Sequence, residues 1–334
     1  MENSYPGGRS FVKQSLSIHG APASATETLI NSLTQSSWKQ YESHLKDWWS
    51  FAVNIGEDPY SPTVKSLLTN LQSLFDSGKS YSTVNTRRSA VSLLCPIEKI
   101  GEHPLVTRFL RGISKLRPPK PKYNFIWDPT DVLQYLGSLE PLSSLSFVDL
   151  TLKLVGLLAL STAHRCQTFS LIDVDQIFVF PDKIEIKIVE PIKTTKPGTK
   201  QPCLVLPFFH DRPNWCAARA LLSYMEFTKQ WRTSGRNRLF LGWTAAHCPV
   251  TAQTIGRWIK IVLDRTGIDT SIFSAHSVRH SATSTALKRG ISMDLIRDRA
   301  GWSERSSVFT RFYKLPLDHR NQFATSIITT SATS

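Results

Sequence analysis

The chain of 334 residues is poor in cysteine, and its cysteines follow no framework pattern. They are odd in number, scattered and never spaced as C-x-x-C; the five are Cys95, Cys166, Cys203, Cys216 and Cys248. This scarcity excludes a disulfide-stapled secreted domain and a zinc knuckle. It is typical of reduced thiols in an intracellular protein.

Long apolar segments are also lacking. The first residues, MENSYPGGRS, contain no apolar core of a signal peptide. The most apolar run, FVDLTLKLVGLLAL, is too short for a membrane span and is interrupted by Asp149 and Lys153. We therefore expect a chain that is neither secreted nor embedded in a membrane.

Acidic residues are in short supply relative to basic ones. Lys and Arg number 40 against 26 Asp and Glu, which gives a formal net charge of +14. Such an excess indicates a polyanionic partner, with nucleic acid first and an anionic membrane surface second. The length exceeds that of a usual single domain, so we expect two.

The sequence patterns divide the chain into four parts. Residues 1–24 are polar and contain Gly and Pro, which predicts a flexible arm. Residues 25–116 show helical periodicity and predict a small helical domain. The prolines and lysines of residues 117–124 predict an extended cationic linker. Residues 125–334 predict helices around one three-stranded antiparallel meander, so the expected fold class is mainly α with a small antiparallel β-sheet, α+β.

Basic side chains gather towards the linker. Two basic lobes joined by an extended segment are suited to close around a nucleic-acid duplex, and the alternative is a merely solvated basic surface. The candidate DNA contacts before and within the linker are Arg87, Arg88, Arg108, Arg111, Lys115, Lys120 and Lys122.

The segment SAHSVRHSATSTALKRG allows two opposed interpretations. His276 and His280 are one helical turn apart, a spacing that suits zinc. However, Ser277 stands where a zinc protease has its glutamate, and Arg279 would repel a dication. If Ser274 caps the helix, His276 and Arg279 lie in or near its first turn, where backbone N–H groups favour an anion. We therefore expect an anion site, with no metal and no cofactor.

Other residues carry chemistry only if they meet in space. Arg165 ends an apolar helix and needs a partner, either a structural carboxylate or a ligand phosphate. Lys193 and Lys196 lie on a predicted β-turn, which is otherwise a plain exposed hairpin. Trp302 follows a Gly break, and Tyr313 has apolar neighbours against which it would otherwise simply pack.

The order of these residues along the chain resembles the catalytic signature of the tyrosine recombinases, the phage-integrase family. The signature elements are Arg165, a hairpin lysine, the H-x-x-R pair His276 and Arg279, AGW at Trp302, and Tyr313. The phrases SYSTVNTRRSAVS, GEHPLVTRFLRGISKLRPPKPKY and HRCQT are similar to recombinases of eukaryotic mobile elements of the DIRS, Ngaro and Crypton kind. The resemblance covers about residues 28–320.

This resemblance implies a helical core-binding domain and a catalytic domain that together clamp double-stranded DNA. It implies a site-specific recombinase or integrase that cleaves and rejoins DNA through a covalent 3′-phosphotyrosyl intermediate, without metal or ATP. It further implies a dimer or tetramer on paired sites and a nuclear location.

The resemblance also assigns roles to the signature residues. Tyr313 would be the nucleophile, and Arg165 with Arg279 would hold the phosphate oxygens. His276 would accept a proton and Lys193 would protonate the leaving oxygen. The remaining assignments are Lys196 as second-choice acid or DNA contact, Trp302 as an N–H donor to phosphate, and His280 as a supporting or packing residue.

Two departures from the family pattern leave alternatives open. Thr168 replaces the acidic residue that many members have three positions after the first arginine, and Gln167 is the candidate substitute. The interval between Trp302 and Tyr313 is longer than in the phage enzymes. The alternatives are a catalytically silent DNA-binding protein derived from a recombinase, and a nicking-resealing enzyme of the type IB topoisomerase kind.

Overall fold

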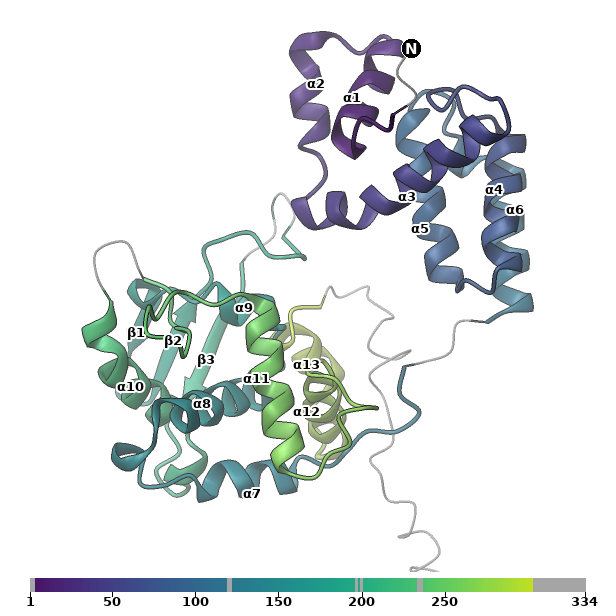
Figure 1. Ribbon diagram of the computed structural model, residues 1–334. Helices are drawn as coiled ribbons and strands as arrows, with labels where there is room; N and C mark the ends of the chain where they lie inside the picture. Colours follow the sequence, from purple (N-terminus) through teal and green to yellow (C-terminus); the bar gives the residue numbers. More distant parts are fainter. Residues whose placement is uncertain (1–3, 119–121, 196–197, 199–200, 233–236, 303–334) are drawn as a thin grey trace, which may run out of the picture. The chain divides into compact units, whose positions relative to one another are not determined.

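The computed structural model describes residues 4–118, 122–195, 198, 201–232 and 237–302. It divides the chain into two compact units, Met1–Lys120 and Pro121–Ser334, which are coloured purple to blue and teal to yellow in Figure 1. The division falls within the segment 117–124. The roles assigned to the two parts from the sequence stay predictions.

Unit 1 is helical in the part that the structure describes. Its α-helices are α1 (Gly8–Ile18), α2 (Ala23–Ile30), α3 (Gln35–Asn54), α4 (Val64–Asp76), α5 (Tyr81–Val91) and α6 (Pro104–Leu116). Thr34, Thr63 and Ser80 precede α3, α4 and α5, and each accepts a hydrogen bond from a backbone N–H of the first turn. These caps explain where the three helices begin.

The first helix corrects the expectation of a flexible arm over residues 1–24. Within α1, the side chain of Phe11 is fully buried and Val12 and Leu16 are nearly so. Phe11 makes edge-on ring contacts with Trp49 and Tyr60, at centroid distances of 5.1 and 4.9 Å. The polar composition of the segment concealed one apolar face, and burial of that face stabilises the helix.

Unit 2 combines helices with one small sheet. Its α-helices are α7 (Thr130–Ser138), α8 (Phe147–Thr162), α9 (Cys166–Ser170), α10 (Ala217–Thr228), α11 (Ala252–Arg265), α12 (Ser277–Lys288) and α13 (Met293–Arg299). The strands are β1 (Ile177–Val179), β2 (Lys183–Lys187) and β3 (Cys203–Pro207), antiparallel in the order β1-β2-β3. The predicted fold class, with its three-stranded meander, is confirmed.

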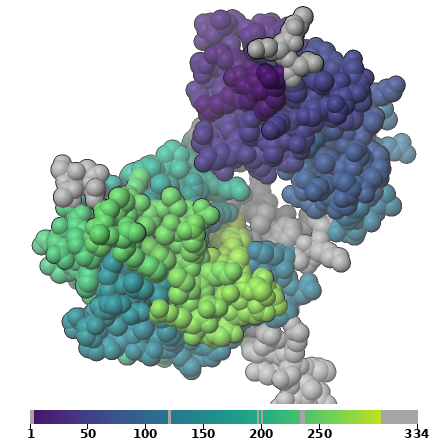
Figure 2. Space-filling view, in the orientation of Figure 1, coloured from purple at the N-terminus to yellow at the C-terminus, as the bar shows by residue number. Residues whose placement is uncertain are grey.

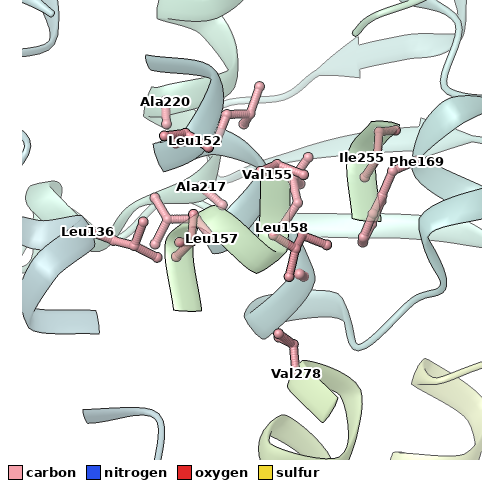
Figure 3. Close-up of a cluster of buried hydrophobic side chains, with 14 of the residues drawn as sticks. Leu136, Leu152, Val155, Leu157, Leu158, Phe169, Ala217, Ala220, Ile255 and Val278 are labelled. Carbon is pink, nitrogen blue, oxygen red and sulfur yellow. The ribbon is translucent and has the colours of Figure 1, made fainter. Parts of the chain in front are cut away.

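Helix α8 is the centre of unit 2. Its apolar side chains are buried on every side, which explains why its sequence shows no polar stripe. Figure 3 shows Leu152, Val155, Leu157 and Leu158 of α8 surrounded by side chains from five other helices. These neighbours are Leu136 (α7), Phe169 (α9), Ala217 and Ala220 (α10), Ile255 (α11) and Val278 (α12).

The two charges that interrupt this apolar run are both paired. Asp149 accepts a hydrogen bond from Arg265 Nη1 at 2.8 Å. Lys153, 1% exposed, donates from Nζ to Glu140 Oε1 and to the Leu139 carbonyl, each at 2.7 Å. Among the described helices, none has the length and apolar character that a membrane span requires.

Replacing Glu140 by alanine is expected to destabilise unit 2 by about 3 kcal/mol, because it leaves the buried ammonium of Lys153 without a counter-charge. The matched control is Glu226→Ala, which removes an exposed pair with Lys229 and should cost less than about 1 kcal/mol. Urea denaturation measures both. Equal effects of the two substitutions would contradict the assignment of Glu140 as the partner of a buried charge.

Candidate active site

The site begins at the turn that ends α8. Ala163 closes the helix in the left-handed conformation, with φ of 51°, and Arg165 follows in extended conformation at the N-cap of α9. The Arg165 side chain is half-buried, and within the described residues no hydrogen bond or ion pair joins its guanidinium to another group. The structural carboxylate considered from the sequence is therefore not found in the described part of the chain.

Helix α12 brings Arg279 to the same turn. Nη1 of Arg279 donates a hydrogen bond to the Ala163 carbonyl at 2.6 Å. The residue is only 2% exposed, and its guanidinium carbon lies 4.1 Å from the centroid of the Trp302 ring. Arg279 thus contacts a carbonyl and an aromatic face, and neither of these two groups carries a charge.

Trp302 is placed by the end of α13. The backbone N–H of Trp302 donates to the Arg297 carbonyl at 2.9 Å, and the backbone N–H of Gly301 donates to the Asp298 carbonyl at 3.0 Å. This is a Schellman ending, and Gly301 adopts the φ of 65° that it requires. Trp302 packs with Ala163 in a small apolar cluster. The glycine before Trp302 therefore turns the indole back onto the turn that ends α8.

The start of α12 differs from the expectation. His276, not Ser274, is the N-cap residue, and its side chain makes no capping hydrogen bond. Ser274 Oγ instead accepts a hydrogen bond from Lys122 Nζ at 2.9 Å, and the Ser274 carbonyl accepts from the Ser277 N–H. His276 and Arg279 nevertheless lie at the N-terminal turn of the helix, where the sequence placed them.

His276 lies among positive charges. Burial, and then the charges of Arg279, Arg165, Lys122 and Lys193, lower the pKa of His276 to about 4. By solvent accessibility His276 is an exposed residue, so the nearby cations matter to its pKa in addition to burial. Among the described residues, every side chain that shifts this pKa is positive. The imidazole is neutral at pH 7 and able to accept a proton.

The backbone of the predicted hairpin lysine, Lys193, is hydrogen-bonded to helix α9. The Lys193 N–H donates to Gln167 Oε1 at 3.2 Å, while the Lys193 side chain is exposed. Gln167 lies in α9, directly after Arg165 and Cys166, and Thr168 beside it is buried. Gln167 therefore links the first arginine's helix to the lysine segment, although it carries no charge.

Five of the predicted catalytic residues are thus linked, some by direct contacts and some by the electrostatic effect of their charges. Arg279 contacts Ala163 and Trp302, and the charges of Arg165, Arg279 and Lys193 act on His276. They come from the turn after α8, the segment between β2 and β3, helix α12 and the end of α13. In the space-filling view, the green to yellow atoms of α11, α12 and α13 form much of the face of unit 2 turned to the viewer (Figure 2).

Comparison with known proteins shows which solved structures share this fold. No protein-family model and no curated protein sequence matches the chain. Among solved structures, XerH site-specific recombinase in a post-cleavage complex with palindromic difH substrate is 13% identical, with a TM-score of 0.63 over 96% of this chain and 95% of that one. The Tn1549 transposon integrase bound to transposon right end DNA is 13% identical, with a TM-score of 0.59 over 98% and 100%.

A lambda integrase dimer bound to a COC′ core site is 16% identical, with a TM-score of 0.55 over 94% of this chain and 97% of that one. The chain has the fold of the tyrosine recombinases. At these identities the likeness concerns the fold alone.

The predicted DNA contacts of unit 1 are not all exposed. Arg87 is 2% exposed and donates to Asp47, to Asn70 Oδ1 at 3.0 Å and to His44 Nδ1 at 3.2 Å. All three nitrogens of its guanidinium are occupied inside unit 1, so the assignment of Arg87 as a DNA contact is wrong. Arg88 is half-buried against Asn85, and the exposed candidates of α6 are Arg108, Arg111 and Lys115.

Three predicted residues, Lys120, Lys196 and Tyr313, lie outside the described residues. His280 is 7% exposed and meets the rings of Tyr123 and His276 edge-on. In the described part of the chain, one cluster has metal-ligand atoms within 4.8 Å of one another. It consists of His19, Cys95 and Glu98 in unit 1 and includes neither histidine of α12.

Sequence reasoning missed two residues of the site. Lys122 was assigned to DNA binding in general, yet its charge acts on His276. His164 was given no role, although Arg165 and Arg279 both act on it. The only available signal was adjacency, because His164 directly precedes Arg165 in the sequence HRCQT.

Proposed function

We propose that the chain is a DNA strand transferase of the tyrosine recombinase type, which cleaves and rejoins double-stranded DNA through a phosphotyrosine. The observation that carries this proposal is the gathering of positive charges around a neutral histidine. The side chains are Arg165, Arg279, Lys193 and Lys122, and His276 lies among them. A site with this charge is suited to an anion, and a phosphodiester is the anion that the recombinase fold and the net charge of +14 together favour.

In this proposal the arginines replace a metal ion. Arg165 and Arg279 bind the non-bridging oxygens and stabilise the charge that builds on a pentacoordinate phosphorus. Arg279 is already fixed by Ala163 and Trp302, so little reorganisation is needed when the phosphate arrives. Trp302 would add its indole N–H to a phosphate oxygen.

The proton transfers balance within the site. Tyr313 attacks phosphorus, its phenol proton passes to neutral His276, and the P–O5′ bond breaks. Lys193 gives a proton to the departing O5′, with Lys196 as the second candidate. The phosphotyrosyl ester keeps the energy of the phosphodiester, so attack by a 5′-hydroxyl reverses the step without ATP.

The kind of recombinase, its location in the cell and its assembly belong to the same proposal. The quoted phrases support a recombinase or integrase of a eukaryotic mobile element, and hence a nuclear location. Assembly as a dimer or tetramer on paired sites is supported by lambda integrase, whose solved structures include a dimer on a core site and a tetramer on a Holliday junction.

A nicked suicide substrate tests the proposal. Cleavage near the nick releases a short fragment and traps the protein on DNA, and a denaturing gel detects the adduct. The wild-type chain, incubated in EDTA with the terminal repeats of its own element, is expected to give this adduct. Binding without any adduct would instead favour the catalytically silent alternative, which Thr168 leaves open.

A further inference from the structure

Lys193 lies in a tight turn that is built from its own neighbours. The Thr195 N–H donates to the Ile192 carbonyl at 2.9 Å, and the Ile192 N–H donates to Thr195 Oγ1 at 2.8 Å. Thr195 Oγ1 in turn donates to Gln201 Oε1 at 3.1 Å. Lys193 is therefore one of the two central residues of a turn, 192–195, whose ends are hydrogen-bonded to each other.

An ion pair attaches the same segment to helix α9 just before the turn. The side chain of Glu190 pairs with Arg238, whose Nη1 also donates to the Leu171 carbonyl at 3.0 Å. Leu171 is the C-cap residue of α9, where backbone carbonyls lack a partner within the helix. Arg238 thus joins the segment between β2 and β3 to the C-terminal end of α9.

Gln167 attaches the turn itself to the same helix. Its Oε1 accepts the hydrogen bond from the Lys193 N–H at 3.2 Å, across 26 residues of sequence. Gln167 lies in α9, and Arg165 is the N-cap residue of that helix. The Lys193 side chain is exposed, so packing constrains it little, and the position of its backbone decides which atoms its ammonium group can reach.

The place of Gln167 favours an uncharged acceptor. It lies two residues after Arg165, the guanidinium that we assign to the phosphate. A carboxylate there would attract this guanidinium and compete with a phosphate for it. The amide oxygen accepts the hydrogen bond from Lys193 without adding a charge.

We propose that Gln167 is a positioning residue, which holds Lys193 at a fixed spacing from Arg165 through helix α9. The contact is a property of the protein alone, whereas its effect on cleavage rests on the proposed function. The pair of Glu190 with Arg238 keeps the segment attached when the Gln167 contact is removed, so the turn is freed without being detached. Two measurements, one without DNA and one with it, separate the contact from its effect.

The first measurement is the exchange of the Lys193 amide proton with water, followed by NMR of the intact chain without DNA. Gln167→Met keeps the length of the side chain but removes the amide oxygen, and Gln167→Glu keeps an oxygen acceptor. The Lys193 amide is expected to exchange about 5-fold faster in Gln167→Met and within about 2-fold of wild type in Gln167→Glu. Gln253→Met, at an exposed glutamine of α11, is the matched control and should change nothing at Lys193.

The second measurement is the rate of adduct formation on the suicide substrate. Gln167→Met is expected to slow cleavage about 10-fold with unchanged DNA affinity, because Lys193 is misplaced for proton transfer to the leaving oxygen. On a 5′-bridging phosphorothiolate the leaving group is a thiolate, which departs without a proton donor. Gln167→Met and Lys193→Ala should therefore both cleave this substrate within about 2-fold of wild type. On the ordinary substrate, adding Gln167→Met to Lys193→Ala should cause no further loss.

Each contrary outcome is decisive. Wild-type exchange of the Lys193 amide in Gln167→Met would overturn the contact. Faster exchange with wild-type cleavage would overturn the effect on catalysis. A loss of cleavage that the phosphorothiolate does not restore, or that adds to the loss from Lys193→Ala, would show that Gln167 does not act through Lys193. If the wild-type chain forms no adduct at all, the proposed function fails, while the exchange measurement still decides the contact.

Discussion

Replacing Tyr313 by phenylalanine is expected to abolish the covalent adduct while DNA affinity stays within about 2-fold of wild type. The substitution removes one oxygen, and that oxygen is the atom that forms the bond to phosphorus. Residues 314–334 contain no other tyrosine that could replace it. DNA affinity depends instead on charge, which the substitution leaves unchanged. Gel analysis of suicide-substrate reactions and a titration of labelled DNA measure the two effects.

Tyr123→Phe is the matched control for this loss. Tyr123 is buried in unit 2, where its hydroxyl shares a hydrogen bond of 2.8 Å with Ser274 Oγ. This variant also loses one phenol oxygen close to α12, but not the proposed nucleophile, so it should still form adduct. A Tyr313→Phe protein that cleaves as wild type would remove Tyr313 from the mechanism. The phosphotyrosine would then have to be mapped by digestion of the adduct.

The sequence pointed to which residues form the candidate site, but not to the contacts among them. Arg165, His276, Arg279 and Trp302 were singled out because their order along the chain resembles the recombinase signature, and their roles stay predictions. Their contacts were not predictable, because they join segments more than a hundred residues apart, as in the hydrogen bond from Arg279 to Ala163. His164 was missed for the same reason. Its ring lies close to Gly301, which follows another helix, and nothing local marks the position.

The basic residues of unit 1 show a second limit of prediction from the sequence. Charge counting treats every arginine alike, yet Arg87 is buried against Asp47 while Arg108 on α6 is exposed. The difference depends on a carboxylate from α3 and an amide from α4 that meet Arg87 only in the folded unit. The fold class was predictable from periodicity, because alternation in β2 and β3 and the continuous apolar run of α8 are local signals.

Arg165→Ala is expected to separate stability from activity. The guanidinium of Arg165 has no hydrogen bond or ion pair to any described residue, so its removal should leave the free energy of unfolding unchanged within about 0.5 kcal/mol. The rate of cleavage should fall about 100- to 1000-fold, because one of the two groups that stabilise the transition-state charge is lost. Arg279→Ala should lower both the free energy of unfolding and the rate of cleavage, since it also removes the buried hydrogen bond to Ala163.

The pKa of His276 reports the same change without DNA. The positive charge of Arg165 is one cause of the lowered pKa, so Arg165→Ala should raise the pKa of His276 towards its ordinary value, as followed by NMR of the imidazole. Arg289→Ala, at the exposed C-cap of the same helix α12, is the matched control and should change neither the His276 pKa nor the cleavage rate by more than about 2-fold. A strong loss of stability in Arg165→Ala would mean that Arg165 holds the fold together. The charge around His276 would then no longer argue for a bound phosphate.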